Sequence, residues 1–145
     1  MGKRGRHSPL TTTKKGSAGY DWFTPFLALH TLFNHMGTRS NIRLTYSDRN
    51  KVVFYQHWDG DTLSDVLKAA LKRGKERWDD APYLARIIFS EMVKDDIEGL
   101  TGWGITTEVQ EENWFTLDVN LEEQMVEWVD RGGKGHCLSF AEFID

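Results

Sequence analysis

Hydrophobic and polar residues alternate over residues 41–47, NIRLTYS, with the period of two that is typical of a strand with one buried face. The next apolar segment, KVVFYQHW (51–58), is rich in β-branched and aromatic residues and predicts a second strand. Between them, residues 47–50 are Ser, Asp, Arg and Asn, which favour turns. The pattern therefore predicts a β-hairpin over residues 41–58.

Two later segments carry the helical period instead. An apolar stripe at spacings of three and four residues predicts a helix over 63–73, with Thr62 and Asp65 in a capping arrangement and Gly74 ending it. A second stripe predicts a helix over 81–94, with Asp79 and Asp80 before its N-terminal end, which favours negative charge. The stripe residues of the first helix are Leu63, Val66, Leu67, Ala70 and Leu71.

The C-terminal third is predicted to return to strands. Residues 95–104 are glycine-rich and irregular, and short strands are expected at 105–109 and 114–119. Residues 120–130 fit either a helix or the return strand of a hairpin, and the hairpin is favoured because a strand directly precedes polar connecting residues. Residues 131–137 read as a loop, and Ser139 with Glu142 predicts a capping box over a final helical turn.

These elements predict an α+β fold with an antiparallel sheet of four or five strands and two main helices on one face. Residues 36–145 would form this single domain. Residues 1–20 are almost without apolar side chains and are expected to be flexible, whereas residues 25–34 predict a short amphipathic helix. Residues 1–35 are thus expected to be a basic extension, and the alternatives for it are a docking helix, a targeting peptide or codons read from an early start.

Charge is unevenly distributed along the chain. The net charge is −4, but residues 1–35 carry five basic side chains against one acidic, and residues 36–145 carry 13 basic against 21 acidic. The acidic main domain is a poor nucleic-acid binder by charge, so nucleic-acid binding is expected only through the basic residues 1–20.

The number of cysteines and the length of the apolar runs exclude further classes of protein. The single cysteine, Cys137, excludes an internal disulfide and a cysteine-rich zinc site, which fits a reducing, cytoplasmic setting. No apolar run approaches the about 18 residues needed to span a bilayer, so no membrane association is predicted.

The string YQHWDG (55–60) offers the clearest candidate chemistry. On a strand, His57 and Asp59 would point to the same face, and Asp61 could join them around a metal ion in a hydrolase or nuclease. The preferred interpretation is structural: Asp59 and Gly60 form a turn in which glycine takes positive φ, Asp61 lies near a helix N-terminus, and Trp58 is buried on the core face. No catalytic residue, metal or cofactor is therefore assigned, and an enzyme is the less favoured class.

Three further features are given structural interpretations. The acidic residues Asp95, Asp96 and Glu98 suit a solvated helix end, and Cys137 beside His136 suits a half-buried thiol. The glycine-rich residues 132–135, GGKG, could hold an anion on backbone amides, although the pattern lacks the spacing of a phosphate-binding loop.

The strings MGTRSNI (36–42) and YQHWDG (55–60) resemble a family of small uncharacterised phage and prophage proteins. Members begin with Met-Gly-Thr-Arg-Ser and end their second strand with Tyr-x-His-Trp-Asp-Gly or a similar string. The resemblance covers Met36–Gly60 and weakly the segment SFAEFI (139–144), but Asp61 and Thr62 stand where the family usually has Tyr-Pro. It implies a phage-associated cytoplasmic protein of unknown function and suggests that Arg39 pairs with Asp59.

The leading functional expectation is an accessory protein that acts by binding another protein, which could be a host factor. An acidic domain, an excess of aromatic residues and the lack of a catalytic constellation motivate it. The expected binding residues are Arg39, His57 and Trp58.

Overall fold

The computed structural model describes residues 38–47, 50–109 and 115–145. The chain divides into two units, Met1–Phe33 and Asn34–Asp145, and all described residues belong to the second. The helix expected at 25–34 and the middle of the turn expected at 47–50 lie outside the described residues.

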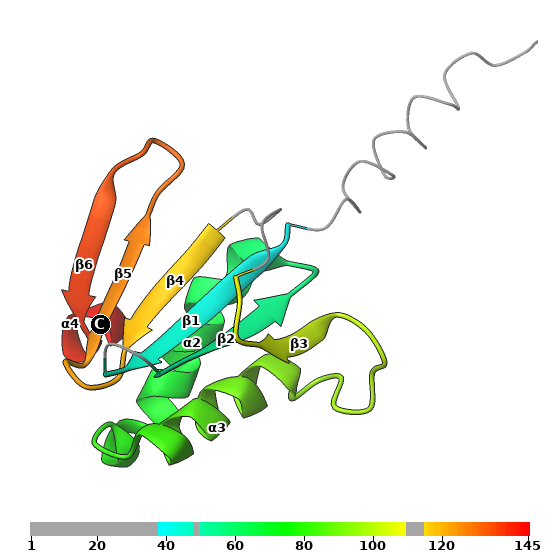
Figure 1. The fold of residues 1–145 in the computed structure, drawn as a ribbon, viewed down its shortest axis with the longest axis horizontal. Coiled ribbons are helices and arrows are strands. Elements are labelled where there is room, and N and C mark those ends of the chain that lie inside the picture. Colours follow the sequence, from blue (N-terminus) through cyan, green and yellow to red (C-terminus); the bar gives the residue numbers. More distant parts are fainter. Residues whose placement is uncertain (1–37, 48–49, 110–114) are drawn as a thin grey trace, which may run out of the picture. The chain divides into compact units, whose positions relative to one another are not determined.

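The predicted hairpin strands are present. Strand β1 (Ser40–Tyr46) pairs antiparallel with β2 (Asn50–Gln56), in a register that joins Ser40 to Gln56. The sheet continues with β3 (Trp103–Thr106), β4 (Phe115–Asn120), β5 (Met125–Val129) and β6 (Gly135–Ser139). In space the order is β3-β2-β1-β4-β5-β6, as Figure 1 shows.

The sheet has six strands and is mixed, which corrects the expectation of four or five antiparallel strands. The two central strands, β1 and β4, run parallel, while all other neighbours are antiparallel. Two helices and β3 lie between β1–β2 and β4 in the sequence, and this long connection allows a parallel pair. The extra strand is β6, where residues 131–137 were expected to be a loop. Residues 125–129 form the return strand of a hairpin, as favoured.

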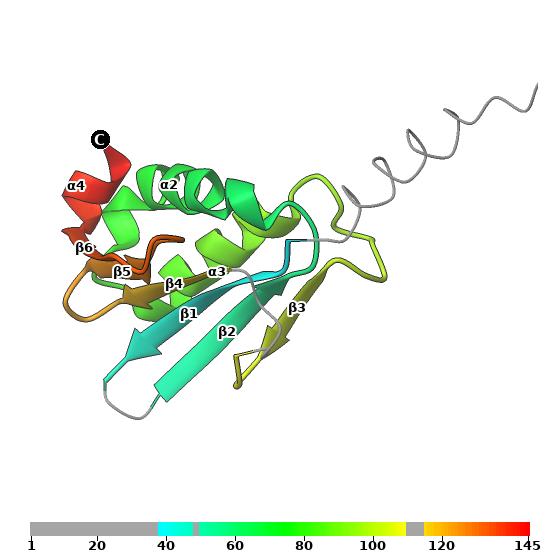
Figure 2. The same cartoon turned by 90° about the horizontal axis from the view of Figure 1, so that it is seen from above.

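The main helices, α2 (Leu63–Arg73) and α3 (Ala81–Val93), lie on one face of the sheet together with α4 (Phe140–Ile144) (Figure 2). Short 3₁₀ turns, η1 (Gly60–Thr62) and η2 (Lys75–Arg77), precede the two main helices. The predicted stripe of α2 is buried at Leu63, Leu67, Ala70 and Leu71. These side chains form one core with Ile42, Leu44 and Phe54 of the sheet, and with Leu84, Ile88 and Phe140.

The two predicted helix caps have different outcomes. At α4, the Ser139 hydroxyl accepts from the Glu142 amide at 3.3 Å and the Glu142 carboxylate accepts from the Ser139 amide at 2.9 Å, which confirms the capping box. At α2, Thr62 makes no side-chain cap. Its hydroxyl instead donates to the Asp59 carbonyl at 2.8 Å.

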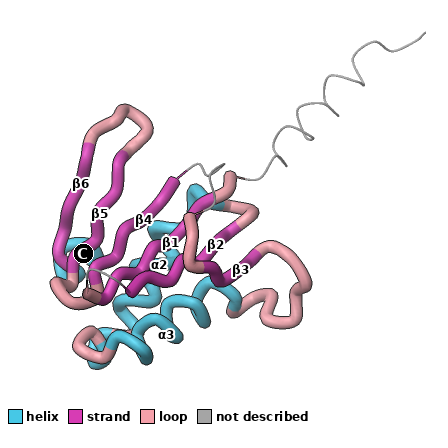
Figure 3. Tube along the Cα trace, in the orientation of Figure 1, coloured by secondary structure: helices cyan, strands magenta, loops and turns pink. Residues whose placement is uncertain are grey.

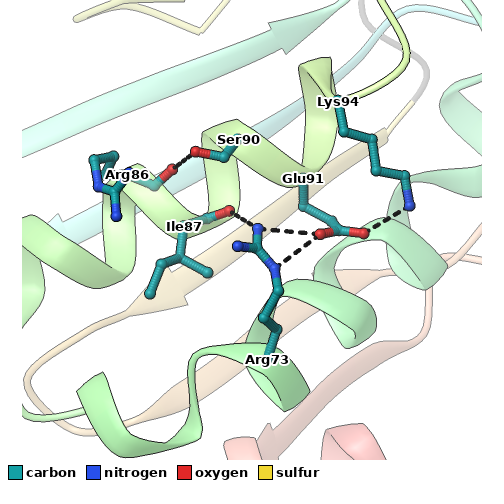
Figure 4. A network of polar contacts seen from close by, with 6 residues as sticks. All are labelled: Arg73, Arg86, Ile87, Ser90, Glu91 and Lys94. Atoms are coloured by element: carbon teal, nitrogen blue, oxygen red, sulfur yellow. Dashed lines mark hydrogen bonds and ion pairs between the residues drawn. The ribbon is translucent and has the colours of Figure 1, made fainter.

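A polar network joins α2 to α3 (Figure 4). The Arg73 guanidinium donates to the Glu91 carboxylate at 3.1 Å and to the Ile87 carbonyl at 3.0 Å. Lys94 donates to the other oxygen of Glu91 at 2.8 Å. Glu91 thus bonds the C-terminal ends of both helices. Among the helices of the described residues, none has the length and apolar content to cross a membrane.

Candidate functional site

The chain after β2 makes a sharp turn against the residues that lead into β1. Asp59, not Gly60, takes the left-handed conformation, with φ 54°, which corrects the expected role of the glycine. Gly60 is required for a different reason. Its amide donates to the Thr38 carbonyl at 2.9 Å, and a Cβ at Gly60 would lie 2.2 Å from that oxygen. The turn is therefore closed by backbone contact between residues 38 and 60.

His57 is held between two aromatic neighbours. Its Nδ1 lies 2.6 Å from the hydroxyl of Tyr55, and its ring meets the Trp58 ring edge-on at 4.2 Å between centroids. The His57 amide donates to the Gly102 carbonyl at 2.8 Å, which ties this position to the segment that enters β3. The His57 ring thus packs against the Trp58 ring, and the bond to Gly102 holds the backbone at His57.

Trp58 is 42% exposed, so the prediction that it is buried in the core is wrong. The strand ends at Gln56, and the alternation of inward and outward side chains ends with it. Gly102 packs against the edge of the indole: a Cβ there would lie 3.3 Å from Cδ1 of Trp58, and Gly102 has φ 101°. One edge of the indole is therefore fixed while much of its surface faces solvent.

Further apolar side chains are exposed just before Gly102, in the α3–β3 loop at the β3 edge (Figure 3). Leu100 is completely exposed and Ile97 is 79% exposed. The acidic residues between and before them, Asp95, Asp96 and Glu98, are exposed as predicted. We call Trp58, Ile97, Leu100 and these three carboxylates the Trp58 surface.

The residues considered for a metal site do not converge. Asp59 and Asp61 are exposed on the turn and on η1, and the Nδ1 of His57 is occupied by Tyr55. Within residues 38–47, 50–109 and 115–145, no group of three or more His, Cys, Asp or Glu side chains could hold a metal ion.

Ser40 pairs with Gln56 across the hairpin. Arg39 directly precedes Ser40, and His57 directly follows Gln56. This places Arg39 at the same end of the sheet as His57. The suggested pairing of Arg39 with Asp59 stays a prediction. The contact between these segments is made by Thr38, whose carbonyl and hydroxyl oxygens both accept from the Gly60 amide.

The glycine-rich segment 132–135 is organised around a carboxylate of the chain itself. Asp130 accepts from the amides of Gly132 and Lys134, both at 2.9 Å, and its second oxygen lies 2.8 Å from Nε2 of His136. The bond from His136, followed by that from the Lys134 amide, lowers the pKa of Asp130. Asp130 thus occupies amides that could otherwise have held an external anion.

His136 and Cys137 point to opposite faces of β6. The His136 ring stacks on Trp128 at 4.8 Å, whereas Cys137 lies opposite Glu127. Cys137 is exposed, which corrects the expected half-buried thiol. Their separation excludes the adjacent pair as a thiolate and base.

A cavity of about 760 Å³ lies between the hairpin end of β1–β2 and the N-terminal end of α3. The sequence pattern does not indicate this cavity, because its lining comes from five separate segments. Its apolar walls include Leu44, Val52, Pro82, Ala85 and Leu121, and its polar lining includes Tyr46, Lys51, Asp79 and Asp80.

Comparison with known proteins adds no relative. No family model, no curated protein and no solved structure matches the chain.

Proposed function

We propose that this protein acts by binding another protein through the Trp58 surface. The observation that supports the proposal is the half-exposed indole of Trp58, which contacts His57 and Gly102, two residues after the exposed Leu100 in the chain. Tryptophan dominates the energy of many interfaces, and an anchor that is already ordered loses less entropy on binding. The surface combines both properties.

The carboxylates indicate the chemistry of the partner. Asp95, Asp96 and Glu98 are exposed and adjoin the exposed apolar residues of the α3–β3 loop in the sequence, so the matching surface would be an apolar depression with basic residues at its rim. The excess of acidic side chains over residues 36–145 would speed the approach of such a partner. Arg39 lies at the same end of the sheet as His57, and we include it in the proposal as a residue at the margin of the Trp58 surface.

The resemblance of residues 36–60 to phage and prophage proteins motivates the biological setting. We infer a phage-associated accessory protein of the cytoplasm, with a bacterial host protein as its partner. The full chain, immobilised at physiological salt, is used to capture proteins from a bacterial lysate, and each captured protein is purified and titrated against it.

The decisive comparison is between variants that each remove an exposed apolar or aromatic side chain. Trp58→Ala is expected to weaken binding about tenfold or more, and Leu100→Ser several-fold. Tyr83→Ala removes another exposed aromatic ring, on α3, and should leave affinity unchanged. A partner that binds the wild type and Trp58→Ala equally would refute the role of this surface, as would the lack of any partner whose binding survives purification.

The large cavity favours a second candidate function, the binding of a small apolar molecule. A volume of about 760 Å³ whose lining combines apolar side chains with polar groups is typical of ligand sites. The dye 8-anilinonaphthalene-1-sulfonate should fluoresce with the native protein, and Ala85→Trp should abolish this by filling the cavity. Equal fluorescence in a folded Ala85→Trp protein would show that the dye binds elsewhere.

Two other functions remain as alternatives with simple tests. A metal-assisted hydrolase built on His57, Asp59 and Asp61 requires that Mn²⁺ or Zn²⁺ raise the melting temperature and that Asp59→Ala remove this effect. Nucleic-acid binding through residues 1–20 requires an affinity that falls steeply with salt and vanishes when these residues are deleted.

A further inference from the structure

Strands β4 and β5 separate before either of them ends. Their pairing runs from Asn120 with Met125 to Asp118 with Glu127 and goes no further. Both strands nevertheless continue, β4 back to Phe115 and β5 on to Val129. Figure 1 shows the two strands diverging toward the β5–β6 loop. Residues 115–117 and 128–129 therefore face each other without pairing.

Cavities are present on both faces of the sheet at this divergence. A cavity of about 390 Å³ is lined by Thr116, Asp118 and Glu127, which share the face without helices. A second cavity of about 230 Å³ is lined by Asp61 and Ser64, on the helix-covered face. Phe115 and Val129 line both cavities. The two cavities thus adjoin at the divergence, and we call this region the β4–β5 notch.

The walls of the notch are held in place. On one side, Asp118 of β4 forms an ion pair with Arg43 of β1. On the other side, Asp130 binds two amides of the β5–β6 loop and His136, whose ring stacks on Trp128. These contacts hold β4 and the end of β5 to their neighbours on the sides away from the notch.

We propose that the β4–β5 notch binds an extended peptide that inserts as an additional strand and carries basic side chains. Unpaired strand edges are templates for strand addition, because main-chain hydrogen bonds supply affinity without regard to sequence. Here two such edges face one another, so an inserted segment would bond to β4 and to β5.

The charges specify the peptide. Glu127 lines the notch on one face together with Asp118, and Asp61 lines it on the other together with Asp130 and Arg131. Carboxylates therefore outnumber cations on both faces. Successive side chains of a strand point to opposite faces. Two consecutive basic residues would therefore place one cation beside Glu127 and the other beside Asp61, with β-branched residues on either side.

The first probe is the fluorescein-labelled hexapeptide Val-Thr-Lys-Arg-Val-Thr, titrated against the full chain by fluorescence anisotropy. Saturable binding is expected, together with slower amide hydrogen exchange at 115–117 and 128–129. A peptide with N-methyl groups on alternate amides cannot pair on one side and should bind at least tenfold more weakly. Equal binding of the two peptides, or protection confined to the edge strands β3 and β6, would overturn the proposal.

Matched carboxylate variants test the charges. Glu127→Gln and Asp61→Asn should each weaken binding about two- to fivefold, as expected for partly exposed ion pairs. Glu122→Gln, in the β4–β5 turn, changes the net charge equally but lies outside the notch lining and should have no effect. Equal losses in all three variants would indicate unspecific attraction and contradict an inserted strand.

Another copy of this chain is the competing occupant. Sedimentation of the unliganded protein should show a monomer, and the peptide should leave that state unchanged. A dimer that the peptide dissociates would assign the notch to self-association and overturn the proposal. The Trp58 surface plays no part here, so Trp58→Ala should bind the peptide normally, and either proposal can fail without the other.

Discussion

The hydroxyl of Tyr55 lies 2.6 Å from Nδ1 of His57, so the tyrosine and the imidazole form a hydrogen bond. A tyrosine hydroxyl donates readily to a neutral imidazole nitrogen. We therefore predict that neutral His57 has its proton on Nε2, which ¹⁵N chemical shifts of the labelled ring will report. Tyr55→Phe removes the donor and should shift the ring toward a mixture of tautomers. A ring protonated on Nδ1 in the wild type would contradict this donor assignment.

The contact between Gly60 and Thr38 predicts a strong and local sensitivity to substitution. A Cβ at Gly60 would meet backbone oxygen at 2.2 Å and Ser40 at under 3 Å, so Gly60→Ala must displace the turn. We expect a loss of about 2 kcal/mol or more in the free energy of unfolding, measured in urea. Gly135→Ala is the matched control, since nothing lies within 4 Å of a Cβ there, and it should be nearly neutral. Equal stabilities of the two variants would show that the turn is not closely packed.

The local elements could be predicted because their signals lie within short windows of sequence. The stripe from Leu63 to Leu71 determines α2 to the residue, and Ser139 with Glu142 determines the start of α4. The sheet order could not be predicted in this way. The parallel pairing of β1 with β4 joins Ile42 to Leu117, and no local pattern records a partner so distant in the sequence.

The candidate site shows where periodicity stops being informative. The inference that Trp58 is buried extended the alternation of β2 beyond Gln56, where the backbone already leaves the sheet. The positive φ of Asp59 was also missed, because glycine is the commoner residue for that conformation and Gly60 is adjacent. The exposure of Leu100 had a visible signal: an apolar residue inside the irregular, glycine-rich segment 95–104.

Glu91 predicts an acid-dependent part of the stability. The hydrogen bond from Lys94, followed by the charges of Lys94 and Arg73, lowers the pKa of Glu91 despite an opposing effect of burial. A carboxyl group with a lower pKa in the folded state than in the unfolded state stabilises the fold at pH values above the unfolded-state pKa. This stabilisation is lost as the pH falls through the folded-state pKa. Glu91→Gln should therefore cost about 1 kcal/mol at neutral pH.

The pH dependence distinguishes this effect from simple packing. The difference in unfolding free energy between wild type and Glu91→Gln should shrink as the pH falls below 4.5, the ordinary value for this carboxyl. Glu76→Gln, an exposed carboxylate of η2, should cost little at any pH. A Glu91→Gln penalty that persists unchanged in acid would mean that the carboxylate charge does not contribute.

Cys137 is exposed, and yet its reactivity should be low. Desolvation and then the nearby Glu127 carboxylate, whose Oε1 is 3.4 Å from Sγ, raise the pKa of the thiol above its ordinary value. Only the thiolate reacts with iodoacetamide, so alkylation near about pH 8.5 should be slower than that of free cysteine. Glu127→Gln removes the nearest negative charge and should accelerate the reaction, while Glu122→Gln should have a much smaller effect. Because Cys137 is the only cysteine, mass spectrometry reports this rate directly, and alkylation as fast as that of free cysteine would contradict the raised pKa.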